Sequence, residues 1–338
     1  MILNSYGVLL TLVDVIRLAL GLVALWLGLT ACVAGFRRSV LDRTAAEDRL
    51  YLTFLLTTLL IGLNVASWPL LYLLLQSYVS EWPGVMCIYG VTRIGADSDG
   101  PSRFLPGLTM WLQLIKPVAV FLGGAWFALY LVNRRTQTGP LTRRLLWWLI
   151  PLGAITIADA AAELAYVVIP KTECVPSVGC CTVEADSRQL LPPILMSPGE
   201  REWLTRGYYC LNFALIAGIA LVARQPRAGR VVLLIVVGLS AALSSAVFLV
   251  EVAAPSLLNL PDHHCAYDLI PRVPESMVAV ALYLTGGFAL GWAGVVCWLG
   301  RTTSTRDLVP HFVRSLLNVS FWSYVAAIVM FFLELSLA

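Results

Sequence analysis

Long apolar runs, separated by shorter polar segments, recur along the whole chain. Each is about 20 residues or longer, enough for a helix to cross the roughly 30 Å hydrocarbon core of a bilayer. The runs cover approximately 8–36, 50–80, 104–133, 144–170, 206–224, 231–256, 276–300 and 315–336. Because they are continuous, and do not alternate in polarity as barrel strands would, they predict helices. We therefore expect an all-α fold, a polytopic transmembrane bundle of about eight helices.

The composition agrees with a membrane protein. Hydrophobic residues make up 59% of the chain, charged residues only 13%, and the mean hydropathy is +0.81. A soluble globule of this size could not bury so much apolar surface. The first run lacks a preceding basic segment and is too long for the apolar region of a secretory signal, so we expect it to remain as the first helix.

The polar segments between the apolar runs are alternately basic and acidic along the chain. Those after runs 1, 3, 5 and 7 hold fourteen basic and four acidic residues, whereas those after runs 2, 4 and 6 hold seven basic and eleven acidic ones. By the positive-inside rule, the first set faces the cytoplasm and both termini lie outside, in a multi-pass protein of the bacterial inner, cytoplasmic membrane. The net charge of +3 thus reflects topology, and no nucleic-acid partner is expected.

Two outer segments share a motif. The sequence "PGVMCIYGV" begins at Pro83 and "PDHHCAYDL" at Pro261, so Pro-x-x-x-Cys-x-Tyr recurs after 178 residues. An offset of four helices preserves orientation, which predicts a parallel tandem repeat about an axis along the membrane normal. We expect two four-helix units, 1–200 and 201–338. Between them, Ser197-Pro198-Gly199-Glu200 fits a helix start near Pro198.

Six of the eight cysteines lie in or beside outer segments. They are Cys87, Cys174, Cys180, Cys181, Cys210 and Cys265. An even number on the oxidising side of a membrane is typical of a disulfide framework. The repeat favours a Cys87–Cys265 bridge, and Cys174 could pair with Cys180 or Cys181. The bonds would then pin loops that have no core of their own.

A thiol–disulfide relay is the catalytic alternative for these cysteines. Its candidates are Cys87, Cys265, Cys180 and Cys181, with electrons passing to a membrane quinone. Membrane enzymes of the vitamin K epoxide reductase and quinone-dependent disulfide-forming types carry Cys-x-x-Cys at a helix end, which this chain lacks. We expect that the protein is not an enzyme; if it is one, we expect a thiol–disulfide oxidoreductase.

The second motif copy adds two adjacent histidines. Together with the neighbouring cysteine, His263, His264 and Cys265 are a candidate site for copper or zinc. The simpler alternative is a solvated turn at the end of the sixth helix. No resident cofactor is otherwise predicted.

Several ionisable residues fall inside the predicted spans, where each is costly unless it has a partner. Asp14 and Arg17, three residues apart, can pair along one helix face. Lys116 and Asp159 lie about 16–18 Å below the outer ends of consecutive helices, so we expect them to touch. Glu163 lies one turn away, and Glu251 is a further candidate for this polar cluster. The second unit has no counterpart to Lys116.

These patterns leave three functions open, since neither a nucleotide-binding loop nor a hydrolase motif occurs. The first is a membrane subunit whose disulfide-pinned outer loops dock an extracytoplasmic protein, in a transport or electron-transfer complex. The second is a redox or metal-handling membrane protein. The third is a proton or small-solute transporter that uses the Lys/Asp/Glu cluster. Lipid and other protein subunits are the expected partners.

Overall fold

The structure of the chain is a computed structural model. It describes residues 4–34, 43–82, 85, 87–96, 99–136, 139–170, 198–260 and 263–337. Within these ranges the regular structure is helical, without a strand, as predicted. Eight of the described helices are long and apolar enough to cross a membrane, which confirms the predicted polytopic bundle.

The chain divides into two compact units, Met1–Cys180 and Cys181–Ala338. The predicted division into 1–200 and 201–338 stays a prediction; residue 200 lies in the helix Pro198–Arg224. That helix begins at the residue indicated by the Ser-Pro-Gly-Glu signal. Each unit contains four of the eight candidate spans.

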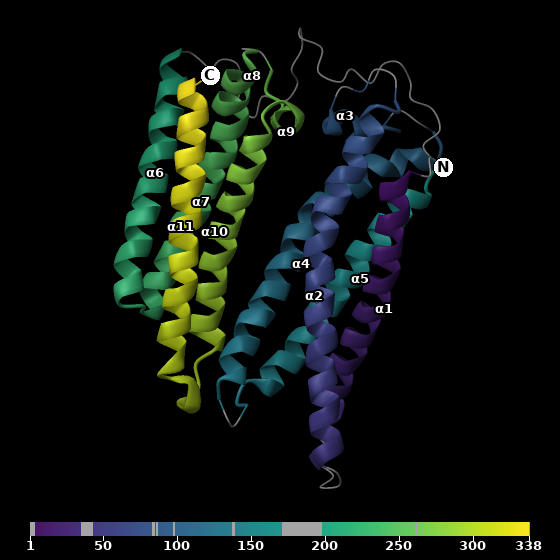
Figure 1. Cartoon of the computed structure of the whole chain (residues 1–338), viewed down its shortest axis with the longest axis vertical. Helices are drawn as coiled ribbons and strands as arrows, with labels where there is room; N and C mark the ends of the chain where they lie inside the picture. Colours follow the sequence, from purple (N-terminus) through teal and green to yellow (C-terminus); the bar gives the residue numbers. More distant parts are fainter. Residues whose placement is uncertain are drawn as a thin grey trace. The chain divides into compact units, whose positions relative to one another are not determined.

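The first unit has four long helices (Figure 1). They are α1 (Ser5–Ala34), α2 (Arg43–Val79), α4 (Leu105–Arg134) and α5 (Thr142–Val168). α1 packs against α2 and α5, while α4 packs against the same two helices, so each helix has two neighbours. The short helix α3 (Ile88–Thr92) and a 3₁₀ turn (Pro101–Phe104) lie in the connection between α2 and α4.

The second unit repeats this arrangement. Its long helices are α6 (Pro198–Arg224), α7 (Ala228–Phe248), α10 (Pro274–Leu299) and α11 (Leu308–Leu337). α6 packs against α7 and α11, and α10 against the same two helices. A π-helical turn (Leu249–Ala253) continues α7 into α8 (Ala254–Leu258). A 3₁₀ turn (Ala266–Asp268) and α9 (Leu269–Arg272) then lead into α10. A further 3₁₀ turn (Thr303–Thr305) precedes α11.

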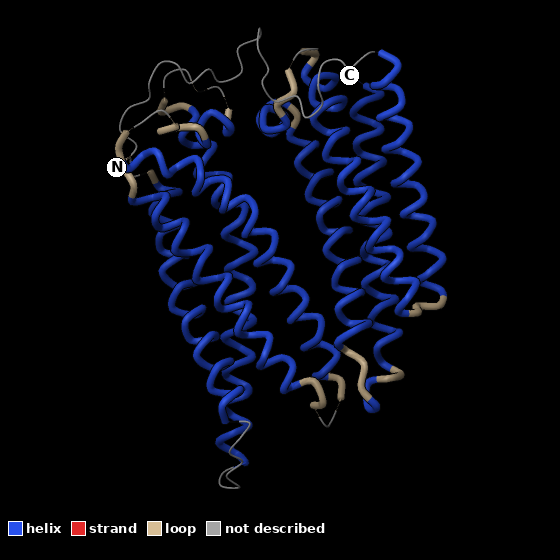
Figure 2. Tube along the Cα trace, turned by 180° about the vertical axis from the view of Figure 1, so that it is seen from behind, coloured by secondary structure: helices blue, strands red, loops and turns tan. Residues whose placement is uncertain are grey.

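Side chains on the helix surfaces fit a lipid environment. Large apolar residues such as Leu55, Trp203, Leu243 and Trp298 are more than half exposed, which is unusual for a soluble protein but expected where lipid covers the surface. Figure 2 shows both groups of helices as long, nearly continuous rods. Which helix ends face the cytoplasm remains a prediction from the arginine distribution.

The duplicated motif has a similar local structure in each unit. Cys87 precedes α3 and Cys265 precedes the 3₁₀ turn before α9, each with an extended backbone. Both cysteine side chains are buried. This likeness, together with the shared order of neighbours, supports the tandem repeat, which itself stays a prediction.

Candidate functional site

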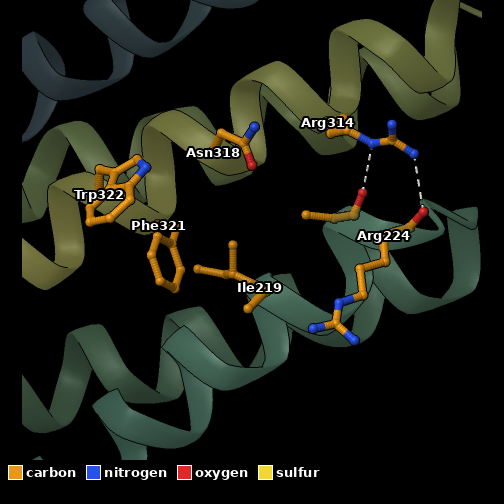
Figure 3. A pocket seen from close by; sticks show the side chains of 8 residues that line it. Ile219, Arg224, Arg314, Asn318, Phe321 and Trp322 are labelled. Carbon is orange, nitrogen blue, oxygen red and sulfur yellow. Dashed lines mark hydrogen bonds between the residues drawn. The ribbon is translucent and has the colours of Figure 1, made fainter.

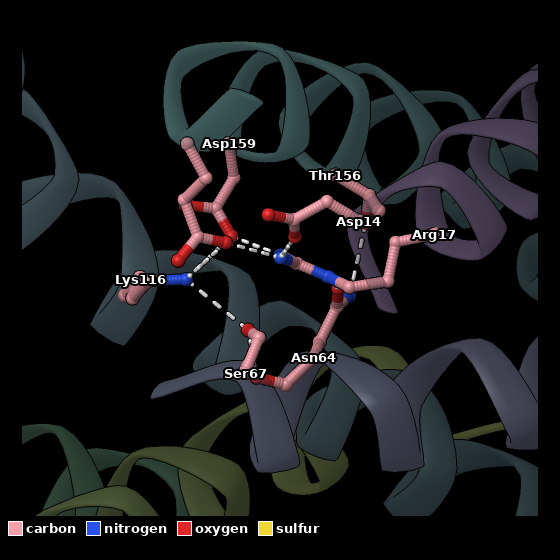
Figure 4. A network of polar contacts seen from close by, with 8 residues as sticks. Asp14, Arg17, Asn64, Ser67, Lys116, Thr156 and Asp159 are labelled. Carbon is pink, nitrogen blue, oxygen red and sulfur yellow. Dashed lines mark hydrogen bonds and ion pairs between the residues drawn. The ribbon is translucent and has the colours of Figure 1, made fainter. Parts of the chain in front are cut away.

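The first unit contains a buried polar cluster, formed where its four long helices meet (Figure 4). α1, α2, α4 and α5 each contribute to it. Its members are Asp14, Arg17, Asn64, Ser67, Lys116, Thr156, Asp159 and Glu163, and every one of them is at most 2% exposed. We refer to these eight residues as the charge cluster.

Arg17 is the centre of the charge cluster. Its Nη1 donates hydrogen bonds of 2.6 Å to both Asp14 Oδ1 and Glu163 Oε2. Its Nη2 donates to Asp159 Oδ2, and its Nε donates to Asn64 Oδ1 at 2.9 Å. Four of the five guanidinium N–H groups are therefore engaged, with partners on three helices.

Lys116 is the second cation. Its Nζ lies 2.8 Å from Glu163 Oε2 and 3.3 Å from Asp159 Oδ2, and donates to Ser67 Oγ at 3.1 Å. Lys116 thus contacts both acids of α5 and one hydroxyl of α2. The predicted Lys116–Asp159 contact is thus confirmed, as is the Asp14–Arg17 pair.

The charge cluster contains carboxylate oxygens that no described donor reaches. Each of the three carboxylates contacts the cations through one oxygen: Asp14 contacts Arg17 alone, and Asp159 and Glu163 contact both Arg17 and Lys116. The other oxygen of each, Asp14 Oδ2, Asp159 Oδ1 and Glu163 Oε1, is buried without a hydrogen-bond partner among the described residues. With all groups ionised the formal charge is −1, because two cations face three carboxylates. Such a site has room for one more proton or donor.

Close packing of α1 on α5 holds the cluster together. Gly153 of α5 faces α1 so closely that an added Cβ would lie 2.8 Å from both the Gly21 carbonyl oxygen and the Leu25 amide nitrogen. Gly21 is one turn from Arg17, and Gly153 is one turn from Thr156. Small residues thus allow the backbone approach that brings the acids of α5 to Arg17.

Three neutral members were not predicted. Asn64 links Arg17 to α5, since its Nδ2 donates to Thr156 Oγ1 at 2.9 Å. Ser67, one turn further along α2, contacts Lys116. Asp14 and Arg17 were expected to pair with each other, apart from Lys116, Asp159 and Glu163, whereas Arg17 contacts both acids of α5.

Glu251 lies in the second unit, in the π-helical turn. Its Oε2 is 3.2 Å from Nδ1 of His264, and both side chains are fully buried. The hypothesis of a solvated turn is therefore wrong for His264. The π-helical turn shifts the register of the helix locally, and Glu251 lies at its middle position. Membership of Glu251 in one polar cluster with Lys116, Asp159 and Glu163 stays a prediction.

The two adjacent histidines contact different acids. His263 Nε2 lies 2.6 Å from Asp268 Oδ2, whereas His264 faces Glu251. Cys265, the next residue in the sequence, is buried. A copper or zinc site at His263, His264 and Cys265 remains a prediction.

The remaining cysteines are only partly described. Cys210 and Cys297 carry free thiols. Cys174, Cys180 and Cys181 lie outside the described residues, so their predicted pairings and their candidacy in a redox relay stay predictions. A Cys87–Cys265 bridge, which would join the two units, also stays a prediction.

The second unit has a neutral hydrogen-bond network in place of the charge cluster. Asn212 of α6 donates to Ser245 of α7 at 3.1 Å and accepts a bond of 2.9 Å from Tyr283 of α10. Ser245 in turn donates to the Tyr283 hydroxyl at 2.8 Å. This network contains no charged side chain, and the sequence of the second unit has no counterpart to Lys116.

Comparison of the chain with protein-family models, with curated proteins and with solved structures found no match. Function must therefore be argued from the site itself. The charge cluster is the strongest basis for that argument, because it concentrates five ionisable side chains in the interior of one four-helix unit.

Proposed function

We propose that this integral membrane protein transports a proton, or a small solute together with a proton, through its first unit. The charge cluster would be its proton-binding site. The observation that carries the proposal is the set of three buried carboxylate oxygens without a partner among the described residues, in a cluster with one more acid than base. Ionisable residues within a membrane are costly and commonly mark ion or proton pathways.

The excess acid gives the cluster two natural states. With one carboxyl group protonated it is neutral, and with all three ionised it carries one negative charge. The shared Arg17 Nη1 holds the carboxylates of Asp14 and Glu163 close together. Release of that proton would reorganise contacts on three helices at once.

The substitution Asp14→Asn tests this proposal. It would leave two cations and two carboxylates, and the new amide oxygen could still accept from Arg17. We expect the variant to fold with the melting temperature of the parent. We also expect it to lose the infrared band of a protonated carboxyl group and to reduce proton uptake into liposomes, under an imposed potential, to the rate of empty liposomes.

A matched control is Glu202→Gln, which removes an exposed carboxylate that pairs with Arg206 on the surface of α6. It should retain both the infrared band and the uptake. Parent protein without a protonated carboxyl band at neutral pH, or an Asp14→Asn variant that takes up protons as fast as the parent, would contradict the proposal. A purely structural ion-pair cluster would give one of those results.

A membrane subunit with disulfide-pinned outer loops is the second candidate. The favouring observation is that Cys87 and Cys265 are buried and occupy the same position before a short helix. In this proposal the loops dock an extracytoplasmic protein of a transport or electron-transfer complex. A redox relay at the same cysteines is its catalytic variant.

Mass-spectrometric mapping of cysteines in the protein isolated from membranes distinguishes these variants. For a docking subunit we expect a Cys87–Cys265 peptide that survives mild reductant. A pair that opens under mild reductant and re-forms with quinone would favour the relay. Free thiols at both positions in freshly isolated protein would argue against both variants.

A further inference from the structure

A groove in the second unit combines charged and aromatic side chains (Figure 3). It lies between the end of α6 and the first half of α11 and has a volume of about 640 Å³. This is the size of sites that hold small molecules. Residues that line it include Ile219, Arg224, Arg314, Asn318, Phe321 and Trp322.

Polarity changes in order along the groove. Arg314, Asn318 and Trp322 are spaced by four residues, so they lie on one face of α11. From the arginine to the tryptophan the helix rises about 12 Å. The groove therefore begins with a cation, continues with an amide, and ends among aromatic and aliphatic side chains. A phospholipid has the same sequence of groups, from phosphate through glycerol esters to acyl chains.

The arginines have donors left for a ligand. Arg314 Nε donates to the Ala223 carbonyl at 2.9 Å and its Nη2 to the Arg224 carbonyl at 3.1 Å, which satisfies two carbonyls at the end of α6. Its Nη1 makes no hydrogen bond within the described part of the chain. The Arg224 side chain is exposed and has no hydrogen bond or ion pair with another described residue. Both guanidinium groups can therefore bind an anion.

The charge around the groove favours an anionic ligand. Segments 221–231 and 299–315, at this end of the long helices, contain six arginines and a single acid, Asp307. Basic pockets between transmembrane helices bind anionic lipid headgroups, and tryptophan is enriched near the membrane interface. The groove also opens on helix faces where exposed apolar residues such as Leu221 and Val319 indicate lipid.

We propose that this groove is a binding site for an anionic phospholipid. The phosphate would contact Arg224 and Arg314, the glycerol esters Asn318, and one acyl chain Phe321, Trp322 and Ile219. The site is independent of the charge cluster and of the transport function proposed above.

Lipid binding to the purified full chain, in an uncharged detergent, tests this proposal. Native mass spectrometry would compare phosphatidylglycerol, phosphatidylcholine with the same acyl chains, and inorganic phosphate at one ionic strength. We expect phosphatidylglycerol to bind most tightly, and phosphate alone not to compete with it. Arg224→Gln should weaken phosphatidylglycerol binding about five-fold, the loss expected for one arginine near an anionic lipid.

Arg230→Gln is the matched control, because Arg230 is an exposed arginine of the same basic end that does not line the groove. It should leave the affinity unchanged. Trp322→Ala, which keeps all the charges, should weaken phosphatidylglycerol and phosphatidylcholine alike. Equal binding of the two lipids by the parent would overturn the proposal. So would equal losses in Arg224→Gln and Arg230→Gln, or full competition by phosphate, which would indicate a site for the free ion.

Discussion

Arg17→Met is expected to be the most damaging single substitution in the first unit. The guanidinium group contacts all three carboxylates of the charge cluster and Asn64. Methionine fills similar space but donates nothing, so Lys116 alone would face three buried acids. Removal of one partner from a buried ion pair costs about 3–5 kcal/mol. We expect at least that loss in the free energy of unfolding, measured by tryptophan fluorescence in detergent.

Arg206→Met is the matched control for this loss. Arg206 also forms an ion pair at 2.6 Å, with Glu202 on the same helix, but both side chains are about 60% exposed. Exposed pairs contribute about 0–1 kcal/mol, so this variant should unfold almost like the parent. Equal stabilities of Arg17→Met and Arg206→Met would mean that the charge cluster is not assembled as described.

The second prediction concerns the balance of charge. Lys116→Met leaves Arg17 alone against three carboxylates and should lower the free energy of unfolding by about 3–5 kcal/mol. Addition of Glu163→Gln removes one negative charge, at the residue whose Oε2 lies 2.8 Å from Lys116 Nζ. The double variant should therefore be more stable than Lys116→Met alone. A coupling of about 0.5–3 kcal/mol is usual for groups in one network.

A double-mutant cycle measures this coupling. The four proteins would be unfolded under one set of conditions, and the two single effects compared with the double effect. Strict additivity would show that Lys116 and Glu163 do not share one electrostatic network. In that case the charge count of the cluster would lose its physical basis.

The fold follows closely from the sequence, because a bilayer imposes length and polarity on every span. The run predicted over 104–133 corresponds to α4 (Leu105–Arg134), and the capping signal at Ser197-Pro198 marks the start of α6.

The charge cluster was only partly predictable. Depth along a helix identified Lys116 and Asp159 as partners, and the same arithmetic places Arg17, twelve residues from Ser5, about 18 Å into α1. The depth of Arg17 therefore indicated that it lies at the level of Lys116 and Asp159. Neutral members such as Asn64 and Thr156 gave no comparable signal, since hydroxyl and amide side chains within helices often bond to their own backbone, as Thr57 does to Thr53.

The contact between His264 and Glu251 could not be predicted. Thirteen residues separate them in the sequence, across the π-helical turn, α8 and a chain reversal at Asn259, which has a positive φ of 55°. Burial of His264 depends on that reversal. The polar appearance of "PDHHC" therefore indicated a surface loop, although one imidazole is directed into the protein.

The distribution of the charge cluster over the helices also determines an order of assembly. α1 carries a neutral pair, Asp14 with Arg17, and so can enter the membrane with its charges already matched. α4 brings one unmatched cation, and α5 follows with two acids, each costing about 2.5–3.5 kcal/mol to insert alone. When α5 is made, the cations that match its acids are already present on α1 and α4. We therefore expect α1 to remain accessible until α5 emerges, and the first unit to close only when its last helix is in place.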